Sequence, residues 1–153
     1  MSEKNVKILI LSHTGSKSNF KIGSHHYANN LAELGCEVYY SGISNSLAHK
    51  VLNKKDVGSA KIDKLVVDLN IKTLLPLTIR QYKVNSFLNK KTLKILNSKS
   101  VVLDLEFDCI ICDYPYFISI LSLLKYDKLI YRPTDDYFEM KGESVVPYEK
   151  DIC

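Results

Sequence analysis

The apolar residues of this chain gather in short runs separated by polar loops. Five such runs predict strands over residues 6–12, 37–41, 64–69, 107–112 and 128–131. The first run, from Val6 to Ser12, is apolar at nearly every position, which is typical of a strand buried on both faces. Strands of this kind belong to parallel sheets covered by helices on either side.

Helical periodicity fills the stretches between these runs. Tyr27, Leu31 and Leu34 recur at helical spacing, so a helix is predicted with Ser24 as its cap and Gly35 just beyond its end. Further helices are predicted over a short stretch from Ser44 to Leu52, over 78–97, over 117–124 and from Pro147 onward. The alternation predicts an α/β fold, a Rossmann-like parallel sheet with helices on both faces.

Length and composition favour a single globular domain. The chain has 153 residues, with 46% hydrophobic and 25% charged residues. No apolar run approaches the roughly 18 residues of a membrane span, and Met1 to Asn5 lacks the pattern of a secretion signal. The expected compartment is the cytoplasm.

Positive charge is concentrated in the first two thirds of the chain. Residues 1–100 hold 16 Lys and Arg against 6 Asp and Glu, whereas residues 101–153 hold 5 against 11. This asymmetry indicates an anionic partner such as a membrane, a phosphate-bearing substrate or nucleic acid; the alternative is a solvated lysine-rich surface. Nucleic acid ranks last, because no aromatic-and-basic sheet signature is present.

The predicted helix over 78–97 carries much of this positive charge. It could lie on an anionic membrane surface with an aromatic side chain in the interface, or pack on the sheet with its lysines outward. The predicted membrane-contacting residues are Arg80, Lys83, Phe87, Lys90, Lys91 and Lys94.

The loop after the first strand does not fit the standard phosphate-binding motifs. The P-loop pattern requires glycine where Leu11 and Ser16 stand, and Gly15 and Gly23 are too far apart for a dinucleotide fingerprint. What remains is a predicted helix start at Gly23 and Ser24, where free N–H groups favour an anion; an ordinary helix start is the alternative.

Two histidines follow this helix start. Adjacent helical residues point about 100° apart, so His25 and His26 are poorly placed to share a metal ion. One of them could donate to a substrate oxygen, or both could serve in packing or at the surface. Cys109 and Cys112 lie on a predicted strand and have no second ligand pair, so no metal site is predicted.

An acidic pair follows the last predicted strand. Asp135 and Asp136 could provide a general base that takes a proton from an acceptor hydroxyl, kept ionised by Arg132. The alternatives are an aspartate that caps the following turn, or a magnesium site, which ranks lower without a third carboxylate.

Several of these segments together resemble a known family. KIGSHHYANNLAELGCEV at 21–38, YYSGIS at 39–44, DCIICDYP at 108–115 and YRPTDDY at 131–137 resemble the N-terminal domain of GT-B glycosyltransferases. More narrowly, they are similar to the membrane-associated, xanthan-type glucuronosyltransferases of exopolysaccharide synthesis. The resemblance spans roughly residues 6–140.

The resemblance implies a function and a set of site residues. Residues 1–153 would form the acceptor-side domain, holding a lipid-linked saccharide at the inner face of the membrane. A C-terminal domain, absent from this sequence, would bind the nucleotide-sugar co-substrate, so we expect a truncated chain that is inactive alone and needs no other cofactor. Asp136, or else Asp135, would be the base of an inverting transfer. The predicted substrate-binding residues are Gly23, Ser24, His25, His26, Tyr114 and Arg132.

A different class of protein stays open as the alternative. The same elements could form a non-enzymatic binding or regulatory module of flavodoxin-like topology, with the acidic pair at a strand end. Receiver-type modules carry acids after the first strand, where this chain has Ser12 and His13.

Overall fold

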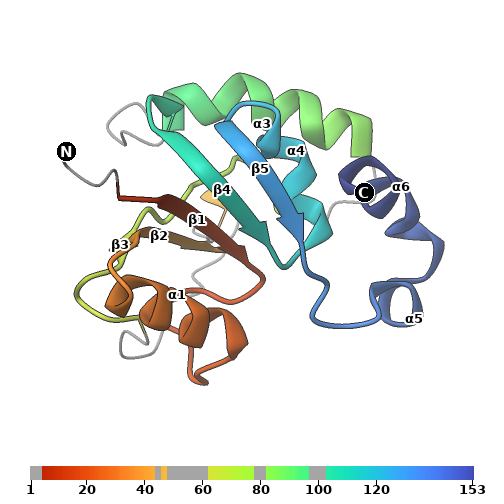
Figure 1. Cartoon of the computed structure of the whole chain (residues 1–153). Helices are drawn as coiled ribbons and strands as arrows, with labels where there is room; N and C mark the ends of the chain where they lie inside the picture. The colour runs from red at the N-terminus through yellow and green to blue at the C-terminus, as the bar shows by residue number, and fades with distance from the viewer. Residues whose placement is uncertain (1–4, 44–45, 48–61, 78–81, 97–102) are drawn as a thin grey trace.

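A computed structural model describes residues 5–43, 46–47, 62–77, 82–96 and 103–153, and shows a five-stranded parallel sheet (Figure 1). The strands run in the order β3-β2-β1-β4-β5 and are all parallel. Their bounds are β1 Lys7–Ser12, β2 Glu37–Gly42, β3 Val67–Asp68, β4 Glu106–Cys112 and β5 Lys125–Tyr131. This open sheet confirms the predicted Rossmann-like α/β architecture.

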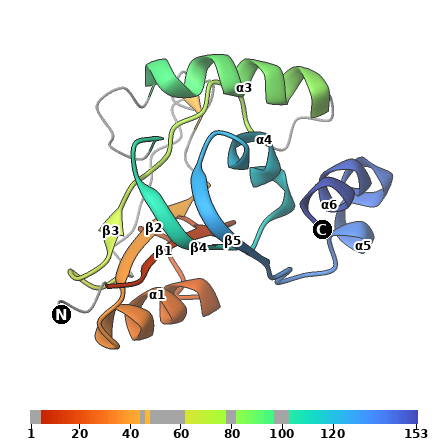
Figure 2. The same cartoon turned by 45° about the horizontal axis from the view of Figure 1, so that its top comes forward.

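Helices lie on both faces of the sheet. Figure 2 shows α1 (Gly23–Glu33) on one side, and α3 (Tyr82–Leu96) and α4 (Ile118–Leu121) on the other. The chain continues past β5 into α5 (Tyr137–Lys141) and α6 (Val146–Ile152), with 3₁₀ turns over Pro115–Phe117 and Gly142–Ser144. The sheet is therefore the middle layer of a three-layer sandwich.

The central strand separates two apolar cores. Leu9 and Leu11 of β1 belong to the core under α3 and α4, whereas Ile8 and Ile10 belong to the core under α1. All four side chains are buried, as the apolar run of the first strand predicts. Each contributes about 1.5–3 kcal/mol by leaving water.

The strand order excludes the topology of the predicted alternative. In the flavodoxin-like order β1 lies between β2 and β3, whereas here its neighbours are β2 and β4. The flavodoxin-like topology is therefore wrong for this sheet. In the observed order the chain leaves β1 toward one edge of the sheet and later returns to β4, on the other side of β1. The topological switch point, where the strand order reverses direction, therefore lies between β1 and β4.

Three predicted elements differ in length from those observed. The strand predicted over 128–131 begins three residues earlier, at Lys125. The strand predicted over 64–69 is reduced to Val67–Asp68, because Asp63 forms a turn in which its side chain accepts the Leu65 N–H at 2.9 Å. The helix predicted over 117–124 becomes a 3₁₀ turn followed by the single turn of α4. Residues 48–61 and 78–81, where parts of predicted helices fall, lie outside the described residues.

The ends of α1 test the predicted caps. Ile22, rather than Ser24, is the N-cap residue, and Ser24 lies inside the first turn. The prediction for Gly35 is confirmed, since it follows the helix with φ of +89°, a conformation that suits glycine.

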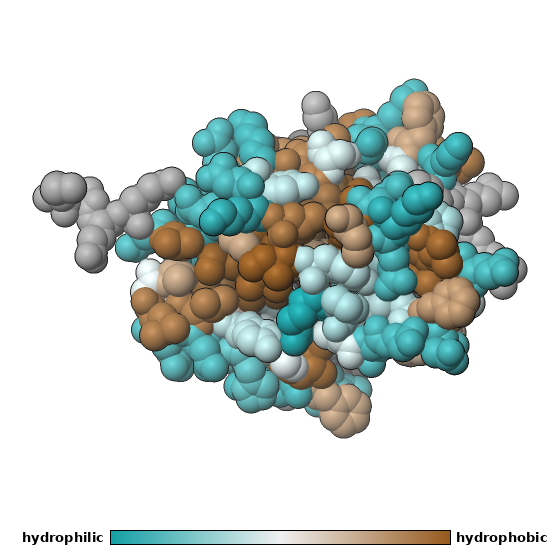
Figure 3. All heavy atoms as spheres, turned by 45° about the vertical axis from the view of Figure 1, so that its right-hand side comes forward, coloured by the Kyte–Doolittle hydropathy of each residue, from teal (hydrophilic) through white to brown (hydrophobic). Residues whose placement is uncertain are grey.

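The face of β4 and β5 on the α1 side carries apolar side chains at the surface. Ile130 is 50% exposed and Ile111 is half-buried. Figure 3, turned to bring the α5 and α6 side of Figure 1 forward, shows apolar side chains gathered between more hydrophilic ones. Within the described part of the chain, no helix combines the length and apolar character needed to cross a membrane.

Candidate functional site

Polar side chains meet at the switch point, where β1 and β4 end side by side. Asp113 follows β4 directly, and its N–H donates to the Leu11 carbonyl at 2.8 Å, which continues the ladder between the strands. His13 directly follows the last residue of β1. The carboxyl ends of neighbouring parallel strands thus bring a carboxylate and an imidazole to one edge of the sheet.

Arg132, just past β5, pairs with the buried Asp113. Its Nε donates to Oδ1 at 3.2 Å and its Nη2 to Oδ2 at 3.5 Å. The Asp113 side chain is 1% exposed and that of Arg132 is 35% exposed. Burial raises the pKa of Asp113, while the hydrogen bond and charge of Arg132 act against this rise.

The same guanidinium reaches across to α1. Arg132 Nη1 donates to the Tyr27 hydroxyl at 3.3 Å, and its central carbon lies 4.6 Å from the centre of the Tyr27 ring. A side chain added at Gly23 would meet Arg132 Nη2 at 3.6 Å. The end of β5 and the start of α1 are therefore neighbours at this edge of the sheet.

Thr134 links the histidine to the aromatic side of the site. Its hydroxyl lies 3.4 Å from His13 Nδ1 and 2.9 Å from the Tyr137 hydroxyl, which donates to the Asp113 carbonyl at 2.8 Å. Tyr114 is buried beside them, with its ring 6.3 Å from that of His13. We call the group His13, Tyr27, Asp113, Arg132 and Thr134 the switch-point cluster.

A buried polar layer supports this cluster from below. Ser12 Oγ and Ser24 Oγ are 2.7 Å apart, and the Tyr40 hydroxyl donates to the Thr14 carbonyl at 2.7 Å. The Ile22 N–H donates to His25 Nδ1 at 3.1 Å, so the proton of the neutral ring lies on Nε2, which faces the Gly15 carbonyl at 3.1 Å. These contacts fix the loop between β1 and α1.

This layer includes two of the predicted substrate-binding residues. The side chains of Ser24 and His25 are fully buried and bonded to protein groups, so here they position the loop instead of lining an open surface. The exposed His26 has no hydrogen bond recorded among the described residues, and its predicted role stays a prediction.

The buried ring of His25 makes stability depend on pH. Burial lowers the pKa of His25 below its ordinary 6.5, so between that lowered pKa and 6.5 the unfolded chain binds more protons than the folded chain. The free energy of unfolding is expected to fall as pH decreases through this window, by at most about 1.4 kcal/mol per pH unit. Denaturant unfolding at several pH values from 7 to 5 measures this slope.

Two variants separate His25 from other titrating groups. His25→Asn removes the titrating ring and should flatten this part of the pH profile, while His26→Asn, at an exposed neighbour, should leave it in place. An unchanged slope in His25→Asn would contradict the assignment.

The predicted acidic pair, Asp135 and Asp136, lies beside the cluster. Unlike Asp113, these two residues make no ion pair with Arg132 in the described structure. Asp136 is the N-cap of α5, with Oδ1 accepting the Glu139 N–H at 3.0 Å. Asp135 accepts a hydrogen bond from the Thr134 hydroxyl at 3.2 Å. Both carboxylates are exposed, so the structure shows the capping alternative for Asp136 while their role as a base stays a prediction.

The predicted membrane-contacting residues fall on α3. Phe87 is 56% exposed, and Lys83, Lys90 and Lys91 are also exposed, with Lys91 Nζ 4.4 Å from the centre of the Phe87 ring. Asn89 and Leu93 are buried on the opposite side of the helix, which packs against α4. Arg80 and the side chain of Lys94 lie outside the described residues.

Sequence reasoning missed the most buried carboxylate of the site. Asp113 follows a strand that is apolar over Cys109 to Cys112, and a lone acid at such a strand end was the available signal. His13, Tyr27 and Thr134 carry no comparable signal, because their proximity depends on how α1 and the segment after β5 fold back. Among the described residues, no group of three or more His, Cys, Asp or Glu side chains is arranged to hold a metal ion.

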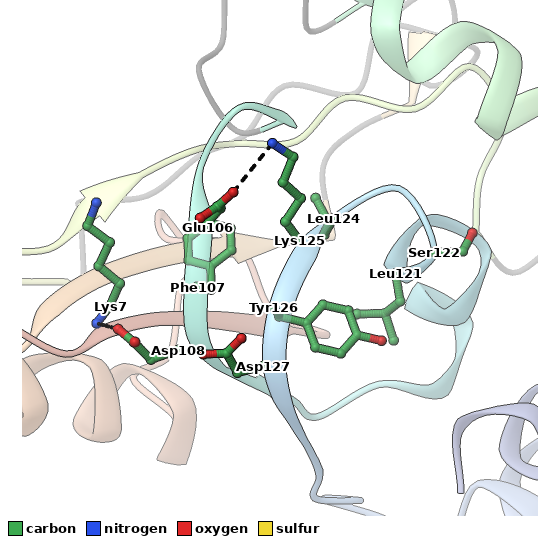
Figure 4. A pocket seen from close by; sticks show the side chains of 10 residues that line it. All are labelled: Lys7, Glu106, Phe107, Asp108, Leu121, Ser122, Leu124, Lys125, Tyr126 and Asp127. Atoms are coloured by element: carbon green, nitrogen blue, oxygen red, sulfur yellow. Dashed lines mark hydrogen bonds and ion pairs between the residues drawn. The ribbon is translucent and has the colours of Figure 1, made fainter.

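A separate hollow of the described structure lies at the opposite edge of the sheet. It encloses about 770 Å³ beside the amino ends of β4 and β5 (Figure 4). Two of its carboxylates already have partners, since the Lys7 backbone N–H donates to Asp108 at 2.8 Å and Glu106 pairs with Lys125 at 3.6 Å. In open parallel sheets ligands bind at the carboxyl ends of the strands, so the switch-point cluster is the stronger candidate.

Comparison of the chain with protein-family models, with curated proteins and with solved structures found no match.

Proposed function

We propose that this chain is the acceptor-side domain of a GT-B glycosyltransferase of polysaccharide synthesis. It would hold a glycan acceptor, in the cell a lipid-linked one at the inner membrane face. A nucleotide-sugar donor would be bound mainly by a second domain, so no transfer is expected from these residues alone. The observation that carries the proposal is the Asp113–Arg132 pair at the switch point, with His13 and Thr134 beside it.

The chemistry of the cluster suits a saccharide. The part-exposed Arg132 guanidinium can donate to sugar oxygens, and the buried Asp113 carboxylate holds it in place. The Thr134 hydroxyl oxygen can accept a hydrogen bond from a sugar hydroxyl. Because Asp113 and Arg132 offset each other, the pair favours a neutral polyhydroxyl compound over a free anion. The absence of a glycine-rich phosphate loop after β1 also favours an acceptor over a dinucleotide.

Three groups in or next to the cluster are candidates to take the proton from an acceptor hydroxyl. The resemblance favours Asp136 or Asp135, and the structure adds His13, which follows β1 at the same edge. Positioned proton transfer accelerates such reactions by about 10²–10⁴-fold. Asp136 Oδ1 is occupied by the α5 cap, whereas Oδ2 has no hydrogen bond recorded among the described residues.

Saccharide binding tests the proposal directly. Saturation-transfer NMR with methyl glucoside, methyl mannoside and maltose should show binding to the chain, and Asp113→Asn should weaken it. Asp127→Asn, at the hollow of the opposite edge, is the matched control and should leave binding unchanged. Equal weakening by both variants, or no response to any saccharide, would refute an acceptor site at the switch point.

We further propose that α3 contacts an anionic membrane surface. Lysines near such a surface contribute about 1 kcal/mol each, and Phe87 provides an apolar contact. The double variant Lys83→Gln, Lys90→Gln is therefore expected to weaken binding to phosphatidylserine-containing vesicles by about 2 kcal/mol, roughly 30-fold. Vesicle flotation at low salt measures the change.

The control removes the same charge from another part of the surface. Lys64 and Lys128 are exposed and lie outside α3, so Lys64→Gln with Lys128→Gln should have a smaller effect. Equal losses for the two double variants would leave only a nonspecific charge effect and would contradict a membrane role for α3.

A further inference from the structure

A second polar hollow adjoins the switch-point cluster. It encloses about 410 Å³ at the carboxyl ends of β1, β2 and β3, and its wall includes His13, Ser16, Lys17, Asp68 and Asn70. We propose that this hollow binds one neutral sugar unit of the acceptor, next to the unit held by the switch-point cluster. The inference rests on the proposed function and extends it to a disaccharide-sized acceptor.

The hollow has a closely packed floor. Gly42 ends β2, and a Cβ atom at this position would lie 2.3 Å from Gly15 Cα and 2.4 Å from the Thr14 carbonyl oxygen. The Tyr40 hydroxyl holds the same carbonyl from below, at 2.7 Å. The loop after β1 therefore rests directly on the backbone of β2, and its polar groups keep a fixed position at the sheet edge.

Asp68 presents a carboxylate that is held in place but not saturated. Ser16 donates its hydroxyl hydrogen to Oδ2, and the Asn70 N–H donates to Oδ1 at 3.2 Å. A carboxylate can accept about four hydrogen bonds, so capacity remains for two hydroxyls of a ligand. An oriented carboxylate with free lone pairs suits the vicinal hydroxyls of a sugar.

The backbone of Asn70 is held in an uncommon conformation at this wall. Its φ is +44°, the only positive φ of a non-glycine residue in the described part of the chain. Such conformations cost of order 1 kcal/mol and gather at ligand-binding sites. The Asn70 carboxamide, which has no hydrogen bond recorded among the described residues, offers both a donor and an acceptor to a ligand.

The charges of the hollow favour a neutral ligand. Lys17 and Asp68 bring one positive and one negative charge, so a free phosphate would meet the carboxylate and a lone cation would meet the ammonium. A polyhydroxyl compound can use both groups at once as hydrogen-bond acceptor and donor. Sugar is therefore the class of ligand that this set of groups fits best.

His13 connects the two subsites. It lines the hollow, and its Nδ1 lies 3.4 Å from the Thr134 hydroxyl of the switch-point cluster. Two linked sugar units could thus contact Asp68 with one ring and Arg132 with the other.

The test uses a variant that removes a side chain without disturbing its backbone. Asn70→Gly keeps the positive φ accessible and deletes the carboxamide, so thermal unfolding should show an intact fold. NMR titration with maltose should give a dissociation constant about three- to tenfold higher than for the natural chain, the loss expected for one hydrogen bond. Asn19→Gly, in the same loop as Ser16 but outside the hollow, should leave the constant unchanged.

Each outcome separates this inference from the proposed function. If maltose binds and Asp113→Asn weakens it while Asn70→Gly has no effect, the hollow is not a sugar subsite and the proposed function stands. If inorganic phosphate shifts the amides of 15–18 and 68–70 and maltose does not, the hollow is an anion site and the inference is wrong. If no saccharide binds the natural chain, both proposals fail.

Discussion

Replacing Gly42 with alanine is expected to lower the free energy of unfolding by about 2–3 kcal/mol. The new methyl group would lie 2.3 Å from Gly15 Cα and 2.4 Å from the Thr14 carbonyl oxygen, and both are backbone atoms that cannot rotate away. The loop after β1 would have to lift off β2, which would also lengthen the hydrogen bond from the Tyr40 hydroxyl to Thr14. Urea denaturation followed by circular dichroism measures the loss.

Gly15→Ala is the matched control for this prediction. It adds the same methyl group to the other partner of the contact, but a Cβ at Gly15 meets no atom within 4 Å. Its stability should stay within about 0.5 kcal/mol of the natural chain, as for surface substitutions in general. Similar losses for the two variants would show that the loop does not rest on β2 in the way described.

Replacing Arg132 with methionine is expected to have the second large effect. Asp113 would keep its buried position and lose both hydrogen bonds from the guanidinium. Breaking a fully buried ion pair costs 3–5 kcal/mol, and because Arg132 is 35% exposed we expect a smaller loss of about 2 kcal/mol. Saccharide binding should be lost as well, since the main donor of the cluster is gone.

A double-mutant cycle with Asp113→Asn isolates the pair. Asparagine removes the charge but keeps the shape, so adding Asp113→Asn to Arg132→Met should cost little further stability. A coupling energy of about 1 kcal/mol or more, measured by urea denaturation of the four proteins, is the expected result. Strictly additive losses would mean that Arg132 stabilises the chain through Tyr27 and not through Asp113.

Strands β1 and β4 were predictable because they carry apolar residues on both faces. Residues 8–12 of β1 and Phe107, Ile110 and Cys112 of β4 are buried, and the alternation of elements predicted the parallel sheet. The length of β3 was overestimated. The Asp63 side chain forms a turn that shortens the strand, and hydrophobic periodicity does not reveal such a turn. Helix α5 was missed although Asp136 and Glu139 have the spacing of a helix cap.

The site was predictable only in part, and for a physical reason. The sequence placed Gly23 at a helix start and Arg132 just past a strand, and the structure brings them together. The sequence did not show that Asp113 is buried and paired, because pairing depends on which strand follows β4 in the sheet. Nor did it show that His25 points inward, since a polar residue at a helix start is usually expected to face solvent.

The most direct test of an acceptor site at the switch point is to map where maltose binds. Two-dimensional ¹H–¹⁵N spectra of the labelled chain, recorded during titration, report each backbone amide separately. We predict that the shifts gather at residues 12–16, 113–114 and 132–134, at the carboxyl ends of β1, β4 and β5. Shifts confined to residues 106–108 and 122–127, around the larger hollow at the opposite edge, would contradict the proposed site.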